Sequence, residues 1–227
     1  MFSHLPSRIV YVRHPQCIHN LGIVAYDAAL ARGISNKDSP LTDNGEIQKQ
    51  LTAEYLKQAF GDFDATFASD FLRTQTIPKA LGKTFIVDAR IGERWHGQLH
   101  ERGSAFFVEF PDEKEAYSSD YYHYRAPDGE SCLDVEARLE DFLSDEQLFL
   151  GCQTILISGH GISGLCLRKL LMHGSLEDWQ RWHGSKEDRL KNASVTVYQR
   201  HDDYYDLTLH NHVPWLGEVE VEETVEA

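Results

Sequence analysis

Short, continuously apolar runs in this chain alternate with longer segments whose apolar residues recur every three or four positions. Apolar runs typical of strands lie at 8–13, 65–68, 84–87, 153–158, 195–200 and 204–209. Helical spacing marks 17–32, 43–60, 71–81, 131–145 and 162–172. Strands that alternate with helices predict an α/β fold, here a three-layer sandwich in which helices flank a mainly parallel central sheet.

Several polar residues and one proline indicate where these elements begin or are disturbed. Asp43, with Glu46 three residues later, is expected to cap the helix that runs to about residue 60. Ser131 and Asp134 form a capping box for the helix over 131–145. Pro78 is expected to disturb the helix over 71–81. The last two strands are expected to be joined by a turn at 202–203.

Two segments depart from the alternation of strands and helices. Residues 98–130 are rich in aromatic and acidic residues, and we expect them to form an inserted helical cap with a small aromatic core. Residues 214–227 include five glutamates in the last ten positions, and we expect them to form an acidic, solvated tail. The chain is therefore divided into one domain over 1–213 and this tail.

Composition limits the classes of partner. The formal charge of −14, from 36 acidic and 22 basic residues, argues against nucleic acid and against anionic membrane surfaces. No apolar run approaches the roughly 20 residues of a membrane-spanning helix. The four cysteines, at positions 17, 132, 152 and 166, lack Cys-x-x-Cys spacing, so we expect them to be reduced and not to bind zinc. The first residues do not resemble an export signal, and a cytoplasmic location is expected.

Side chains suited to phosphate chemistry follow three of the predicted strands. Arg13 and His14 end the first strand, Arg73 lies shortly after the second, and His160 follows the strand at 153–158. Each alone could be an ordinary polar residue at a strand end, and Glu93-Arg94 alone could be a surface ion pair. Parallel strands present their carboxyl ends at one edge of a sheet, so these groups are expected to converge on one pocket.

An ordered set of motifs resembles the histidine phosphatase superfamily, also called phosphoglycerate mutase-like. The first is Arg13-His14 with Asn20 six residues after the histidine, and the last is Ser158-Gly159-His160-Gly161. Between them lie Pro40-Leu41-Thr42-Asp43-Asn44-Gly45, the segment 69–76 with Arg73 in the arginine position, Glu93-Arg94-Trp95-His96-Gly97, and 124–131.

The resemblance implies a metal-independent phosphatase that uses no cofactor and acts on a small phosphorylated substrate. It implies that His14 is the nucleophile and forms a phosphohistidine. It implies that Glu93 is the general acid and then the general base. The remaining residues that it implies for binding the phosphoryl group and substrate are Arg13, Arg73, His160, Asn20, Arg94 and Gly161.

Two differences from the family pattern bear on activity. Pro15 stands where the family usually has glycine, which removes one backbone N–H donor, so reduced or specialised activity is expected. The adjacent arginine pair of the glycolytic mutases is missing, and Arg102 and Arg125 are isolated candidates for a second anion site. Phosphatase activity is therefore favoured over mutase activity. A noncatalytic domain that binds phosphorylated ligands is a further alternative.

Overall fold

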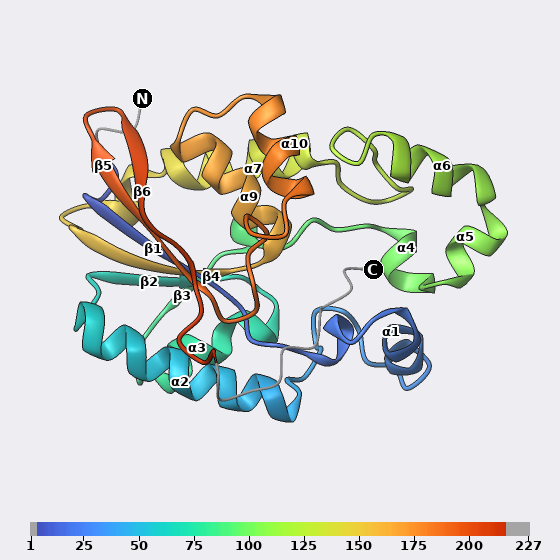
Figure 1. Cartoon of the computed structure of the whole chain (residues 1–227), viewed down its shortest axis with the longest axis horizontal. Coiled ribbons are helices and arrows are strands. Elements are labelled where there is room, and N and C mark those ends of the chain that lie inside the picture. The colour runs from blue at the N-terminus through green and yellow to red at the C-terminus, as the bar shows by residue number, and fades with distance from the viewer. Residues whose placement is uncertain (1–3, 217–227) are drawn as a thin grey trace.

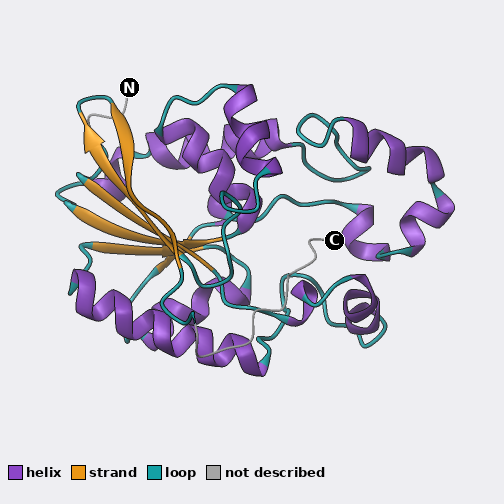
Figure 2. Cartoon of the chain, in the orientation of Figure 1, coloured by secondary structure: helices purple, strands orange, loops and turns teal. Residues whose placement is uncertain are grey.

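A computed structural model of the chain describes residues 4–216. Its centre is a six-stranded mixed sheet with the strand order β3-β2-β4-β1-β5-β6 (Figures 1 and 2). The strands are β1 (Arg8–Arg13), β2 (Ala65–Ala68), β3 (Ile86–Val87), β4 (Thr154–Gly159), β5 (Val195–His201) and β6 (Tyr204–His212). The first four strands in this list pair in parallel, while β5 and β6 are antiparallel, so the predicted mainly parallel α/β sheet is confirmed.

Helices cover both faces of the sheet, with further helices in the predicted cap at one end (Figure 1). The helices on the two faces are α2 (Asp43–Phe60), α3 (Thr76–Ala80), α7 (Cys132–Ser144), α8 (Glu146–Phe149), α9 (Gly161–Leu171) and α10 (Leu176–Gly184). Those in and near the cap are α1 (Ile23–Leu30), α4 (Gln98–Arg102), α5 (Ala105–Glu109) and α6 (Pro111–Ser119). Among the described helices, none is long and apolar enough to cross a membrane.

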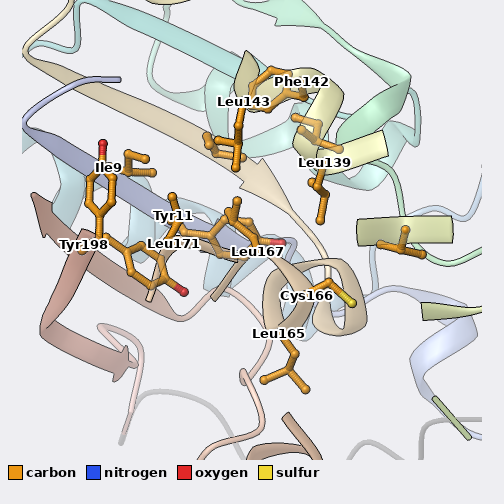
Figure 3. Close-up of a cluster of buried hydrophobic side chains, with 14 of the residues drawn as sticks. Ile9, Tyr11, Leu139, Phe142, Leu143, Leu165, Cys166, Leu167, Leu171 and Tyr198 are labelled. Atoms are coloured by element: carbon orange, nitrogen blue, oxygen red, sulfur yellow. The ribbon is translucent and has the colours of Figure 1, made fainter. Parts of the chain in front are cut away.

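Alternation along β1 divides the core between the two faces of the sheet. Ile9 and Tyr11 pack in a cluster with α7, α9 and α10, part of which Figure 3 shows. Val10 and Val12 lie on the opposite face and pack against α2 and α3. Because neighbouring side chains of a strand point to opposite faces, a continuously apolar strand is what a sheet covered on both sides requires.

The segment predicted as one helix over 17–32 is interrupted. A 3₁₀ turn covers Ile18–Asn20, and α1 starts only at Ile23. Between them, Gly22 has φ of 93°, a left-handed conformation that glycine adopts without steric cost and that a helix cannot contain. The prediction of a continuous helix was wrong because the spacing of apolar residues does not register this backbone reversal.

Other details of the prediction also change. The helix α2 is capped by Thr42, whose hydroxyl accepts a hydrogen bond from the Gly45 amide at 3.0 Å, and not by Asp43. The capping box of Ser131 and Asp134 is confirmed. The helix expected over 71–81 is shortened to α3 after a 3₁₀ turn, and α10 was not predicted.

The cap contains the expected helices α4, α5 and α6, and its aromatic side chains pack on one another. The ring of Phe106, which is fully buried, lies 5.3 Å from that of Phe107, centroid to centroid. At the end of the described chain, Trp215 is buried and its indole N–H donates to the Asn192 carbonyl at 2.9 Å. Residue 215 therefore belongs to the folded domain, and the five glutamates of the predicted tail lie outside the described residues.

Candidate active site

The carboxyl ends of β1, β2 and β4 meet at one edge of the sheet. Arg13 is the register partner of Gly159, and Ala68 is that of Ser158, so the residues that follow these strands are neighbours. A cavity of about 90 Å³ lies there. Its lining consists of Arg13, His14, Cys17, His19, Asn20, Tyr26, Asn36, Arg73, Glu93, His96, His100, Tyr121 and Ile162. The predicted convergence of Arg13, His14 and Arg73 is thus present.

The ring of His14 is held in one tautomer. Its Nδ1 lies 2.7 Å from the Pro15 carbonyl oxygen, and a carbonyl can only accept, so Nδ1 carries the hydrogen. The ring is buried, and burial together with the charges of Arg73 and Arg13 holds its pKa well below the ordinary value. At neutral pH the imidazole is therefore uncharged and Nε2 has a free lone pair.

Pro15 has a direct part in this arrangement. The residue that lacks an amide donor supplies the carbonyl that orients the His14 ring. The following residue, Gln16, is fixed by α2: its amide donates to Gln48 Oε1 at 2.8 Å, and Thr42 Oγ1 donates to Gln16 Oε1 at 2.6 Å. A side chain at Gly45 would place its Cβ 2.0 Å from the Gln16 carbonyl oxygen, so glycine is required there for the loop to approach α2.

His160 lies against His14, with 5.3 Å between the ring centroids. Its Nε2 is 2.8 Å from Ser69 Oγ, while its buried Nδ1 has no hydrogen-bond partner in the described part of the chain. Burial and the Arg73 charge hold the pKa of this imidazole well below its ordinary value. Its backbone is fixed by Tyr11, whose hydroxyl donates to the His160 carbonyl at 2.7 Å and accepts from its amide at 2.6 Å.

Two buried arginines give the cavity its positive charge. Arg13 and Arg73 are each only 5% exposed. Arg13 donates to the Leu190 carbonyl, and Arg73 donates through one terminal nitrogen to the Asn36 carbonyl at 2.6 Å. The Arg73 guanidinium also lies 4.6 Å from the centroid of the Phe71 ring. Burial lowers the pKa of Arg73, but a guanidinium stays protonated in proteins. Both side chains are thus fixed cations that can bind phosphoryl oxygens.

Glu93 joins the cavity to the start of α9. One carboxyl oxygen accepts from the amides of Arg94 and Ser163, both at 3.0 Å. The other accepts from the amides of Gly161 at 3.0 Å and Ile162 at 3.3 Å. The carboxyl group is therefore positioned by four backbone donors and by the positive end of an 11-residue helix. It also lines a neighbouring cavity of about 330 Å³.

Asn20 lines the same cavity. Its Oδ1 accepts from the Cys17 amide at 3.1 Å and from Asn192 Nδ2 at 3.2 Å. This fixes the amide orientation, and its Nδ2 has no hydrogen-bond partner among residues 4–216. Asn192 also donates to the His14 carbonyl at 3.1 Å, so it links two site residues. Asn192 was not predicted, because it lies in a loop with no motif.

Arg94 and Gly161 have positions different from those expected of substrate-binding residues. Arg94 is fully buried in the cap, where it donates to the carbonyls of Glu130 at 2.9 Å, Tyr121 at 2.8 Å and Tyr124 at 2.5 Å. The amide of Gly161 is occupied by Glu93. Arg94 therefore joins the cap to the Glu93 segment, and Gly161 positions Glu93, so neither is retained as a substrate ligand.

The two candidates for a second anion site lie outside the cavity lining. Arg102 is paired with Glu109, and Arg125 is paired with Asp134, and both arginines are exposed. No group of three or more His, Cys, Asp and Glu side chains suited to hold a metal ion occurs within residues 4–216. The four cysteines are all free.

Stability should depend on pH because the site buries several uncharged histidines. Burial lowers the pKa of His14, His96 and His160 well below the ordinary value, that of His19 to about 4 and that of His100 to about 3. In the unfolded chain these groups titrate near pH 6.5, so below that pH the unfolded state binds more protons. We expect the melting temperature to fall as the pH decreases from about 7 to about 5.

Calorimetric melting between pH 7.5 and pH 5 measures this effect. Unfolding at pH 5 should be accompanied by uptake of protons, which is seen as a dependence of the unfolding enthalpy on the buffer. A melting temperature that rises on acidification over this range would contradict the predicted burial of uncharged histidines.

The family model and the relatives that match this chain agree with the family resemblance of its sequence motifs. The family model described as histidine phosphatase superfamily (branch 1) matches residues 9–213. A probable phosphoglycerate mutase of Enterobacter sp. (strain 638) is 34% identical over 168 residues, which are 70% of this chain and 73% of that protein. A phosphoglycerate mutase-like protein of Arabidopsis thaliana is 26% identical, over 83% of this chain and 71% of that protein.

Solved structures share the fold at low sequence identity. The alpha-ribazole phosphatase of Shigella flexneri superposes with a TM-score of 0.72 at 20% identity, covering 90% of this chain and 96% of that one. A mycobacterial glucosyl-3-phosphoglycerate phosphatase in complex with inorganic phosphate gives a TM-score of 0.68 at 21% identity, covering 93% of this chain and 100% of that one.

Proposed function

The chain belongs to the histidine phosphatase superfamily, and from this premise we propose that it is a metal-independent phosphomonoester hydrolase that acts through a phosphohistidine at His14. The observation that carries the proposal is the His14 tautomer. Its Nδ1 donates to the Pro15 carbonyl, which leaves Nε2 as the nitrogen with a lone pair in a ring that lines a doubly cationic cavity.

In the first step, the Nε2 lone pair of His14 forms a bond to phosphorus and the bond between phosphorus and the ester oxygen breaks. The ester oxygen takes a proton from the Glu93 carboxyl group and leaves as an alcohol. Arg13, Arg73 and Asn20 donate to the nonbridging oxygens, whose negative charge is spread in the transition state. These two arginines supply the positive charge that a metal ion supplies in many other phosphoryl transfers.

In the second step, the Glu93 carboxylate takes a proton from water, and the water oxygen attacks phosphorus. The bond between phosphorus and Nε2 breaks, phosphate leaves, and His14 and Glu93 return to their starting protonation states. The hydrogen bond from His14 Nδ1 to Pro15 keeps the ring in place through both steps. His160 adds its Nδ1, which has no hydrogen-bond partner among residues 4–216, as a further hydrogen-bonding group beside His14.

Trapping of the intermediate tests the proposal. Mixing the protein with a phosphate monoester labelled in its phosphoryl group, followed by alkaline quench, should leave label on the protein that acid removes. Mapping should place the label on His14. A protein that binds phosphorylated ligands without catalysis would carry no label and release no phosphate, and either result would reject the covalent mechanism.

Transfer to a second hydroxyl, as in a mutase, requires that an intermediate phosphorylated at two positions be retained. The two isolated arginines considered for that task are paired with carboxylates outside the cavity lining. Hydrolysis is therefore the function that this geometry supports best.

A further inference from the structure

The 18–36 segment and residues 96 and 100 contribute six side chains to the lining of the cavity. Asn20 is assigned to the phosphoryl group in the proposed mechanism, and the Tyr26 hydroxyl donates to the His100 carbonyl at 2.8 Å. The other four are His19, Asn36, His96 and His100, here called the distal wall. His19, Asn36 and His96 are no more than 8% exposed. Both ring nitrogens of His19, Oδ1 of Asn36 and Nδ1 of His96 are buried without a hydrogen-bond partner among the described residues. Buried polar atoms are normally paired, so these atoms indicate a site built for a ligand.

The distal wall is uncharged at neutral pH. Burial and the charge of Arg73 lower the pKa of His19 to about 4 and that of His100 to about 3, and burial lowers that of His96 well below its ordinary value. Among the described lining residues, the charged groups are Arg13, Arg73 and Glu93, which the proposed mechanism assigns to the phosphoryl group and the leaving oxygen. The described lining thus has no further cation for a second anionic group.

The distal wall offers both donors and acceptors. His100 Nδ1 accepts from the His96 amide at 3.1 Å, so Nε2 of His100 carries the hydrogen and is a donor. A neutral imidazole at His19 has one donor and one acceptor, and the Asn36 amide donates to the Tyr26 hydroxyl at 3.4 Å, which leaves Oδ1 as an acceptor. A hydroxyl group both donates and accepts, whereas a carboxylate only accepts and brings a charge.

We propose that the distal wall selects a compact, uncharged, polyhydroxylated leaving group, such as a small polyol or sugar, and disfavours a leaving group that carries a carboxylate or a second phosphate. The inference rests on the proposed phosphatase function. Burial of an unpaired anion against uncharged imidazoles costs more free energy than burial of a hydroxyl that these groups can pair with.

Three substrates with the same three-carbon skeleton test the selectivity. Glycerol 3-phosphate presents two hydroxyls, 3-phosphoglycerate presents one hydroxyl and a carboxylate, and propyl phosphate presents neither. At pH 7.5 we expect kcat/KM for glycerol 3-phosphate to exceed that for each of the others by about tenfold or more. Equal or faster hydrolysis of 3-phosphoglycerate or of propyl phosphate would overturn the inference.

Failure of the proposed function gives a different result. If no phosphate is released from these three compounds or from p-nitrophenyl phosphate, the hydrolase proposal itself is wrong. If p-nitrophenyl phosphate is hydrolysed but glycerol 3-phosphate is not preferred, only the inference on the distal wall is wrong.

Variants then assign the selectivity to individual residues. His19→Leu and His96→Leu should each lower the ratio of kcat/KM for glycerol 3-phosphate to that for propyl phosphate about tenfold. His19→Gln and His96→Gln, which keep polar groups, should recover part of the loss. His201→Leu, on the exposed β5–β6 hairpin, is the matched control. Equal loss on both substrates in a variant that melts at the native temperature would show a general role and overturn the assignment.

Discussion

Replacement of His14 by alanine should lower kcat/KM for phosphate release by about 10⁴-fold or more, the scale on which loss of a covalent nucleophile falls. The reason is structural as well as chemical. The neighbouring imidazole of His160 is not expected to substitute, because its Nε2 is engaged by Ser69 and its backbone amide and carbonyl are both held by the Tyr11 hydroxyl. Steady-state release of phosphate from p-nitrophenyl phosphate measures the effect.

His201→Ala removes an exposed imidazole far along the chain from the site and serves as the control. A folded His14→Ala protein that retains more than about a tenth of native activity would show that phosphoryl transfer does not pass through this residue. We expect the His14→Ala fold to be intact, because the removed ring lies in a cavity and not in the apolar clusters. Circular dichroism and melting of both variants check this.

Glu93→Gln is expected to have the second largest effect, a loss of about 10²- to 10⁴-fold in kcat/KM for an alkyl phosphate. Both oxygens of Glu93 accept from backbone amides, two on each oxygen. Glutamine places an NH₂ group against two of these N–H donors, so it removes the proton donor and also loses two of the hydrogen bonds that hold the side chain. Kinetics with a series of leaving groups measures the change.

Substrates whose leaving groups differ in their need for a proton distinguish loss of the Glu93 proton from displacement of the side chain at residue 93. Nitrophenolate leaves without a proton, so the first step with p-nitrophenyl phosphate should be much less impaired than with glycerol 3-phosphate. Rapid mixing should then show a burst of nitrophenolate as phosphohistidine accumulates, because the second step still lacks its base. The same fold-loss for both substrates without a burst would contradict the acid-base assignment. Glu177→Gln, in the first turn of α10, is a control outside the cavity lining.

Much of the fold and of the candidate active site could be predicted from the sequence. Strands buried on both faces appear as continuously apolar runs, and β1, β2 and β4 are short enough for such runs to mark them. The groups placed directly after these strands, Arg13-His14 and His160, had to converge once the sheet was parallel. For these residues, the apolar run that marks the strand also fixes where the next side chain lies in the folded sheet.

Elsewhere the determining contacts are not local in sequence. Arg94 follows Glu93 and shares its motif, yet the direction of the Arg94 side chain is set by carbonyls in the 121–130 segment, which no spacing rule connects to it. Asn192 reaches the site from a loop, and the distal wall combines residues of two distant segments. Gly22 interrupts a segment with helical spacing because backbone conformation, not side-chain periodicity, decides that turn.

The central place of β1 in the sheet has a consequence for the order of folding. This strand comes from the first residues of the chain, but its hydrogen-bonding neighbours are β4 and β5, more than a hundred residues later. During synthesis the segment Arg8–Arg13 therefore leaves the ribosome long before either partner exists, and it is apolar and unpaired in the meantime. Closure of such long loops is slow. The proposed chemistry, which needs Arg13 and His14 beside His160, should consequently appear only after β1 has paired with β4.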